Sequence, residues 1–192
     1  MRYILFSILI LFYSGCTHKT DITPKEYWAK PVKNIKLENF NKVDEKLYRG
    51  SQPSAEQFAQ LYRFGIRYDL NLRQFHDDAD KLKNLDIKYK HIPTNASSFT
   101  YEQLVEAVAF LISRDKKTFV HCKHGSDRTG IVVAGYRIAA NNWSKEKAIE
   151  EMTKGRYGYH SFWFPNLPKL LQNIDEKQFK NDVKRVAQKS TL

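Results

Sequence analysis

The chain has 192 residues and a formal net charge of +11, from 32 lysines and arginines against 21 aspartates and glutamates. This length suits a single domain with a hydrophobic core, and the 14% of aromatic residues provide bulky side chains for that core. The positive net charge predicts attraction of polyanions. The sequence contains no internal repeat or low-complexity tract, and the lack of a nucleic-acid-binding motif argues against a nucleic-acid partner.

The first fifteen residues have the pattern of a secretory signal. A basic residue at position 2 precedes an apolar run over residues 3–13, which is too short to span a bilayer, and Gly15 comes directly before Cys16. This pattern resembles the bacterial lipoprotein signal, which implies diacylation of Cys16 and a lipid-anchored protein of the cell envelope, periplasmic or surface-exposed. An ordinary secreted protein and an uncleaved membrane anchor are the alternatives.

Residues 16–40 are predicted to form a tether, and residues 41–192 the folded domain. The tether mixes lysine, threonine, proline and asparagine with isolated apolar residues, and it shows no sustained period. At no more than about 3.6 Å per residue it would reach roughly 70 Å, which is enough to hold the domain clear of a membrane.

The first half of the domain alternates strands with a helix. A short strand is predicted at Leu47-Tyr48, and Ser54 opens a capping box for a helix that Gly65 ends. Alternating apolar residues predict a strand over residues 66–72, and residues 87–92 predict another.

The second half continues this alternation. Thr100 opens another capping box and helix, residues 118–120 read as a buried strand, and a helix extends to about residue 142. Ser144 caps the next helix, and a last one is predicted from about Pro165 to Ala187. Strands that alternate with helices predict an α/β fold with a mostly parallel central sheet covered on both faces, and a site at the carboxyl ends of its strands.

Residues 121–130 read HCKHGSDRTG and carry the chemistry of the chain. A strand precedes them and a helix follows, so backbone N–H groups and the positive end of a helix dipole converge on a small loop that can hold a phosphate dianion. The same environment lowers the pKa of the Cys122 thiol. Arg128 adds a planar guanidinium that can bind two phosphate oxygens at once.

This run resembles the His-Cys-x5-Arg-Thr-Gly signature of the cysteine-based phosphatases, which include protein tyrosine phosphatases, dual-specificity phosphatases and their inositol phosphate relatives. The resemblance implies a compact dual-specificity-like domain in which Cys122 attacks phosphorus, Arg128 binds the phosphoryl oxygens and Thr129 eases departure of the thiolate. His121 is expected to orient and tune Cys122. The other residues expected to contact substrate here are Lys123, His124, Gly125, Ser126 and Gly130. Neither a cofactor nor a metal is expected, because no cluster of side chains has metal-ligand spacing.

The proton donor for the leaving group departs from the family pattern. Most relatives carry an aspartate about thirty residues before the nucleophile, whereas residues 92–98 here contain no carboxylate. The favoured substitute is Asp127, whose position is similar to that of the loop aspartate of myotubularins. Asp77, Asp78 and His124 are the alternatives, and Asp127 could instead form a structural ion pair with Arg128.

The substrate class follows from charge and resemblance. Lys123, directly after the nucleophile, resembles the phosphoinositide phosphatases more than the phosphotyrosine enzymes, and Arg73 and Arg156 are further candidate binding residues. An anchored bacterial enzyme of this kind also resembles the inositol polyphosphate phosphatases called cysteine phytases. We therefore expect a monomeric phosphatase for an inositol polyphosphate such as phytate. The alternatives are a tyrosine or dual-specificity protein phosphatase, a phosphatase for lipid phosphoinositides, and a catalytically inactive lipoprotein that binds polyanions.

Overall fold

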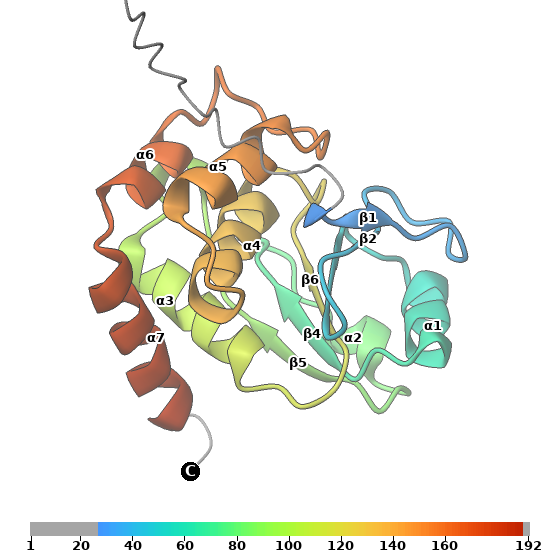
Figure 1. Ribbon diagram of the computed structural model, residues 1–192. Helices are drawn as coiled ribbons and strands as arrows, with labels where there is room; N and C mark the ends of the chain where they lie inside the picture. The colour runs from blue at the N-terminus through green and yellow to red at the C-terminus, as the bar shows by residue number, and fades with distance from the viewer. Residues whose placement is uncertain (1–26, 190–192) are drawn as a thin grey trace, which may run out of the picture.

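The computed structural model describes residues 27–189, in which strands and helices largely alternate along the chain (Figure 1). The strands are β1 (Lys30–Pro31), β2 (Asn41–Lys42), β3 (Leu47–Gly50), β4 (Tyr68–Asn71), β5 (Lys88–His91) and β6 (Thr118–His121). The helices are α1 (Ala55–Phe64), α2 (Ala79–Leu82), α3 (Tyr101–Ile112), α4 (Asp127–Ala140), α5 (Lys145–Lys154), α6 (Asn166–Asn173) and α7 (Glu176–Lys189), with a short 3-10 turn at Ala96–Ser98.

The strands form one mixed sheet in the order β1-β2-β3-β6-β4-β5. β3, β6, β4 and β5 are parallel, and β1 and β2 extend the β3 edge in antiparallel orientation, which confirms the predicted α/β fold class. The last residue of β6, His121, lies level with Gly50 of β3 and Asn71 of β4. The segments that follow these three residues therefore meet at one edge of the sheet.

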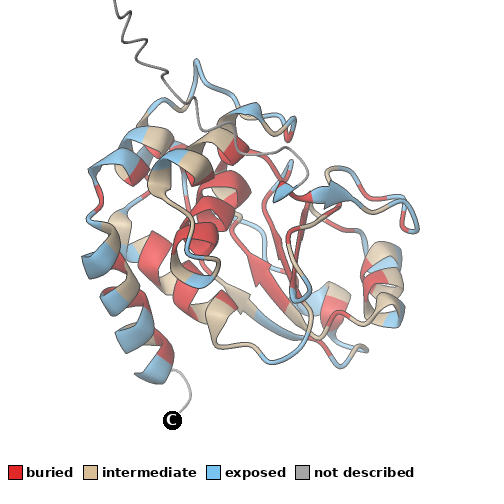
Figure 2. Ribbon diagram, in the orientation of Figure 1, coloured by how far each residue is buried: buried red, intermediate tan, exposed pale blue. Residues whose placement is uncertain are grey.

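Helices cover both faces of the sheet (Figure 1). Helices α3 to α7 pack on one face around a large apolar cluster, while α1 covers the other face around a smaller cluster that includes Phe58 and Phe119. Figure 2 shows α4 as the buried element between the sheet and the outer helices, and every residue from 129 to 138 is buried. Because α4 is packed on all sides, its amino-terminal end is held firmly at the edge where the strand ends meet.

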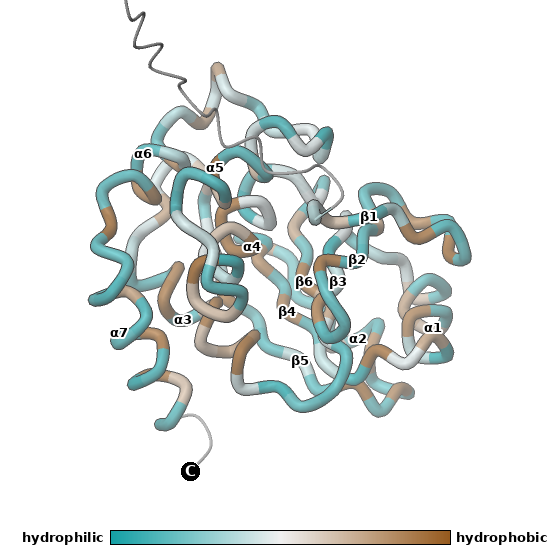
Figure 3. The backbone as a smooth tube through the Cα atoms, viewed as in Figure 1, coloured by the Kyte–Doolittle hydropathy of each residue, from teal (hydrophilic) through white to brown (hydrophobic). Residues whose placement is uncertain are grey.

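The outer helix α7 shows the opposite pattern. Its residues are mostly hydrophilic, with hydrophobic ones at intervals (Figure 3). The buried apolar residues Phe179, Val183 and Ala187 are four positions apart, so they form one stripe that faces the core.

Both predicted capping boxes are present. The Ser54 hydroxyl accepts a hydrogen bond from the backbone N–H of Gln57, whose side chain accepts one from the backbone N–H of Ser54. Thr100 and Gln103 make the same reciprocal pair at the start of α3. Gly65 ends α1 in the left-handed conformation at φ 105°, as its position predicts.

The single helix predicted over residues 165–187 is two helices. Ile174 is extended, with ψ 141°, and separates α6 from α7. The Asp175 carboxylate accepts the backbone N–H of Gln178 at 2.8 Å and so caps the start of α7, while Lys145 donates to the backbone oxygen of Ile174 at 3.1 Å. The apolar period continues through both helices, and for this reason the break was not predicted.

The packed domain begins earlier than the predicted boundary at residue 41. Trp28 and Ala29 are buried, and the Ala29 N–H donates to the Glu151 carboxylate at 2.7 Å. Residues 27–40 therefore belong to the domain rather than to a tether. The predicted signal and Cys16 lie outside the described residues. Among the helices within residues 27–189, none combines the length and the hydropathy that a membrane span requires.

Candidate active site

The phosphate loop, residues 122–128, connects the end of β6 to the first turn of α4. Gly125 adopts a φ of +71°, and a Cβ at this position would lie 2.4 Å from the Gly50 carbonyl carbon. The loop backbone therefore lies directly against the end of β3. The backbone N–H of Gln52 donates to the Lys123 carbonyl at 3.2 Å, and this bond fixes the loop from the same side.

Cys122 lies at the base of this loop with only 3% of its surface exposed. Burial alone would raise the pKa of its thiol. The Thr129 hydroxyl, the Arg128 guanidinium and the backbone N–H groups of Thr129 and His124 outweigh burial and hold that pKa below its usual range. The buried Thr129 hydroxyl has no other hydrogen-bond partner. The site thus favours the nucleophilic thiolate.

The Arg128 guanidinium is fixed by two backbone carbonyls. Its Nη1 donates to the oxygens of Leu72 and Thr94, both at 3.2 Å, which follow β4 and β5. These bonds orient the planar fork and leave its other N–H groups for a phosphoryl group.

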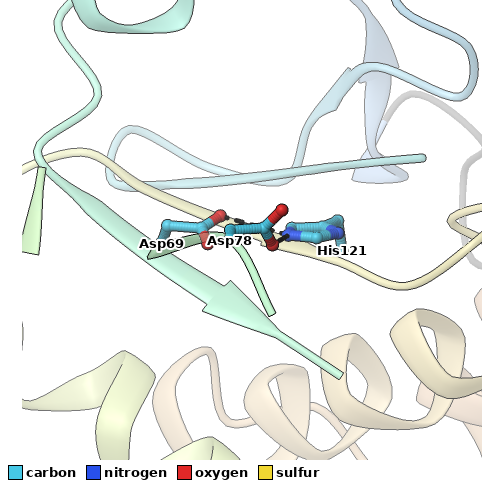
Figure 4. A group of neighbouring side chains, drawn as sticks. All are labelled: Asp69, Asp78 and His121. Carbon is cyan, nitrogen blue, oxygen red and sulfur yellow. Dashed lines mark ion pairs between the residues drawn. The ribbon is translucent and has the colours of Figure 1, made fainter. Parts of the chain in front are cut away.

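His121 is the centre of a buried ion-pair network (Figure 4). Its Nε2 lies 3.1 Å from the Asp78 carboxylate and 3.4 Å from that of Asp69, and all three side chains are fully buried. Burial would lower the pKa of His121, but the two carboxylates raise it to about 10. The other ring nitrogen, Nδ1, lies 3.3 Å from the Cys122 carbonyl, so the imidazolium also holds the start of the loop.

The same three residues are the group with metal-ligating atoms close together among residues 27–189, within 4.8 Å of one another. The ring nitrogen of His121 is in direct contact with both carboxylates, and this contact makes the group an ion-pair network. Sequence reasoning missed Asp69. The available signal was a carboxylate in the middle of the strand predicted over residues 66–72.

Sequence reasoning also missed a cation that lies beneath the loop. Arg49 of β3 is almost completely buried, its Nη2 donates to the Gly125 carbonyl at 2.7 Å, and its guanidinium stacks 4.0 Å from the centre of the Tyr157 ring. Burial lowers its pKa from the usual range. A charged residue inside the buried run Leu47–Gly50 was the available signal.

A cavity of about 410 Å³ opens beside the loop. Its lining includes Gln74, Asn95, Ser97, His124, Asp127, Arg128, His160, Trp163 and Phe164. Asp127 and His124 thus lie in the cavity with Arg128, as their positions in the loop predict. Residues 92–98, which lack a carboxylate, contribute Asn95 and Ser97 to its wall.

Asp127 pairs with His160 and not with Arg128. One carboxylate oxygen accepts the His160 backbone N–H at 2.9 Å, and the other lies 2.9 Å from the His160 Nδ1. No local sequence pattern predicts this pair, because 33 residues separate its members.

The other acid candidates lie elsewhere. Asp78 is buried under the loop, where burial alone would raise its pKa, but His121 and Lys81 lower that pKa to about 2. The Asp77 carboxylate accepts the backbone N–H of Ala79 at the start of α2, and Asp77 lines a different depression beside Tyr89. Neither carboxylate lines the cavity that contains Arg128.

Of the three cationic residues predicted to bind substrate, two lie at or beside the phosphate loop and one lies elsewhere. Lys123 is exposed on the loop, and Arg73 donates to the Gln52 side chain at 3.0 Å, so it lies beside the backbone that holds Lys123. Arg156 instead lines a separate groove with Trp28.

Two further residues predicted to contact substrate, Ser126 and Gly130, pack against the protein itself. Ser126 is buried, and its carbonyl accepts the Gly130 N–H at 2.6 Å. Gly130 faces α5, where a Cβ would come within 3.2 Å of Met152.

The parallel strands at the centre of the sheet, the buried Cys122 before the amino terminus of α4 and the fixed Arg128 together define a cysteine-based phosphatase. A model of the tyrosine phosphatase family matches residues 34–182, and the chain belongs to this family. It is a phosphoric monoester hydrolase of the Cys-x5-Arg type.

Two relatives illustrate the range of the family. The chain is 29% identical to the dual specificity protein phosphatase TpbA of Pseudomonas aeruginosa over 163 residues, which are 82% of this chain and 73% of TpbA. It is 26% identical to the inositol diphosphatase SIW14 of Saccharomyces cerevisiae over 166 residues, which are 81% of this chain and 56% of SIW14.

Solved structures agree with the fold. The crystal structure of TpbA has a TM-score of 0.72 at 26% identity, covering 84% of this chain and 98% of that one, and a variant of TpbA has been solved in complex with pTyr. The catalytic core of SIW14, at 22% identity and a TM-score of 0.66, covers 82% of this chain and 95% of that core and shares the fold.

Proposed function

We propose that this phosphatase works through a covalent phosphocysteine at Cys122, without a metal ion. The thiolate attacks phosphorus, an S–P bond forms, and the P–O bond breaks with its electron pair on the departing oxygen, which takes a proton. Water then attacks the phosphocysteine, the S–P bond breaks, and inorganic phosphate and the thiolate are released. The observation that carries this proposal is the buried Cys122, whose thiol pKa is lowered inside a loop that Arg128 closes.

Two negative groups meet in the first step, so the loop must offset their repulsion. The backbone N–H groups that stabilise the thiolate, the amino-terminal end of α4 and the fixed Arg128 guanidinium all present positive potential to the same place. In the second step the Thr129 hydroxyl is available to stabilise the departing thiolate.

We propose an inositol polyphosphate as the substrate class. Only one phosphate of such a molecule can occupy the loop, and the others need cations nearby. Lys123 and His124 are exposed on the loop itself, and Arg73 lies next to the backbone that holds Lys123. Two relatives, SIW14 and DSP5, are named inositol diphosphatases, which supports this class.

Phosphotyrosine is the second candidate, and a specific feature of the cavity favours it. Trp163 and Phe164 line the wall, and Trp163 is 70% exposed. An aromatic ring on a bound phosphate could stack on these side chains. The pTyr complex of TpbA supports this alternative.

Reciprocal variants separate the two substrate classes. We expect phosphate release from inositol hexakisphosphate to exceed release from a phosphotyrosine peptide, measured as kcat/KM. Lys123→Ala should reduce the first selectively, and Trp163→Ala should leave it nearly unchanged. A preference for the peptide that Trp163→Ala removes would assign the enzyme to protein substrates. A preference for vesicles that contain phosphoinositides would assign it to lipids.

Mechanism and activity are tested with the same assay. A chelator should leave the rate unchanged, and Cys122→Ser should abolish turnover because a hydroxyl is a far poorer nucleophile at neutral pH. Failure of the wild-type protein to release phosphate from any of these substrates would favour the inactive, polyanion-binding alternative.

We also propose that the domain is anchored to a bacterial envelope through a lipid on Cys16. The proposal rests on the apolar run and the small residues before Cys16. Labelling with a fatty acid in a bacterial host should mark the wild-type chain and not Cys16→Ser. A wild-type chain that is released unlabelled into the medium would show secretion instead.

A further inference from the structure

The proposed phosphocysteine chemistry needs a proton donor for the leaving oxygen, and the segment that carries one in many relatives has none here. Residues 92–98 contribute Asn95 and Ser97 to the cavity wall. An amide and a hydroxyl cannot supply a proton by ionising at neutral pH. The titratable side chains that line the cavity are His124, Asp127, Arg128 and His160.

His160 is held in this cavity as one half of an ordered pair. Asp127 is buried at the first turn of α4, and both of its carboxylate oxygens are used: one accepts the His160 backbone N–H and the other contacts Nδ1, each at 2.9 Å. The two contacts fix both the backbone and the ring of His160. In this arrangement Nδ1 carries a proton and donates it in a hydrogen bond to Asp127, so Nε2 is the ring nitrogen that can donate to a substrate.

His160 is more exposed than Asp127, as expected if His160 reaches the substrate and Asp127 holds it from behind. The His160 side chain is 48% exposed, whereas that of Asp127 is 11% exposed. The groups around His160 are Asp127 of α4, the His124 ring at 6.4 Å between centroids and the Phe164 ring at 6.5 Å. Arg128 lines the same cavity. Asp127 is the one anionic group among them, and its carboxylate is the group that accepts the Nδ1 hydrogen bond and fixes the ring.

We propose that His160 is the general acid of this enzyme and that Asp127 is its positioning residue. Protonated His160 gives the Nε2 proton to the departing oxygen as the P–O bond breaks. The neutral imidazole then takes a proton from the water that attacks the phosphocysteine, and this second transfer restores the imidazolium. This inference rests on the proposed phosphocysteine chemistry.

Leaving groups of different acidity test the assignment. An alkyl phosphate such as an inositol phosphate needs a proton on its leaving oxygen, whereas p-nitrophenyl phosphate does not. His160→Ala should lower kcat/KM on the alkyl phosphate by about 10²–10⁴-fold and on p-nitrophenyl phosphate by only a few-fold. Added imidazole should restore part of the alkyl phosphate activity.

The separate effects on kcat and KM distinguish a catalytic role from a structural one. In His160→Ala the loss on the alkyl phosphate should appear in kcat, with KM within a few-fold of the wild type, because the proton is needed only as the P–O bond breaks. Asp127→Asn, which removes the carboxylate that holds the ring, should lower the same kcat by less than His160→Ala does. His76→Ala, which removes an exposed histidine outside the cavity, is the matched control and should leave both constants unchanged.

Each outcome bears on one proposal only. Equal losses on the two substrates in a His160→Ala protein that melts like the wild type would overturn the role of His160 and leave the phosphocysteine standing. Turnover by Cys122→Ser would overturn the phosphocysteine itself. If His160→Ala does not fold, His160→Gln, which keeps a polar side chain of similar size, replaces it in the same comparison.

Discussion

At the residue scale, the interior of this protein contains an imidazolium between two carboxylates. His121 holds the start of the phosphate loop through one ring nitrogen and binds Asp69 and Asp78 through the other. Removal of His121 would leave the buried Asp69 and Asp78 side chains without this cation in a medium of low dielectric constant.

His121→Gln should therefore lower the free energy of unfolding by about 3–5 kcal/mol, the usual effect of breaking a buried pair. Chemical denaturation measures this loss. The exposed His76→Gln serves as the control and should change stability by less than about 0.5 kcal/mol. A His121→Gln protein as stable as this control would show that the network does not support the fold.

The stabilisation by His121 should also depend on pH. Its pKa is raised from about 6.5 to about 10 in the folded protein, so folding favours the protonated form. The contribution is fully present below about pH 6.5 and is lost as the pH rises through about 10. The difference in unfolding free energy between wild type and His121→Gln should shrink over this window, and a constant difference would contradict a buried imidazolium.

Site residues could be predicted from the sequence where they are close together along the chain. Cys122, Arg128 and Thr129 lie in one continuous run, so their grouping was evident from the sequence. No local pattern predicts contacts between residues that are far apart in sequence. Examples are the Asp127–His160 pair and the contact of Arg49 with Gly125.

At the element scale, the phosphate loop depends on two backbone segments that meet without side chains between them. Gly125 lies against the end of β3 in the left-handed region, and an added Cβ would overlap the Gly50 carbonyl at 2.5 Å. The loop has no room to accept that atom in place.

Gly125→Ala should displace the loop and lower kcat/KM by about 100-fold or more, because small errors in the position of reacting groups are costly. Gly65→Ala is a matched control at another positive φ. Its Cβ would meet only the Lys117 side chain, at 3.6 Å, so we expect a loss of about 1–2 kcal/mol in stability with activity retained. Full activity in folded Gly125→Ala would contradict the close contact.

Elements with strong local signals were predicted well. Both capping boxes, the Gly65 helix end and the four parallel strands are present in the structure. The break between α6 and α7 and the strands β1 and β2 were not predicted. In each case tertiary contacts, such as those of Lys145 and Glu151, decide the local conformation.

At the scale of the whole molecule, a net charge of +11 should draw polyanionic substrates toward the loop. If the substrate is an inositol polyphosphate, its advantage in kcat/KM over a phosphotyrosine peptide should shrink as salt is raised. The Debye length falls from about 10 Å at 0.1 M to about 3 Å at 1 M, which screens the exposed cations first. An advantage that is independent of salt would show that contacts other than charge select the substrate.

The proposed mechanism requires phosphorylation of Cys122 during turnover. Rapid acid quenching of the wild-type enzyme with substrate, followed by mass spectrometry of its peptides, tests this directly. We predict phosphate on the peptide that contains Cys122, and none on Cys122→Ser, which should be inactive. Phosphate on another residue, or turnover by Cys122→Ser at a rate near that of the wild type, would contradict the mechanism.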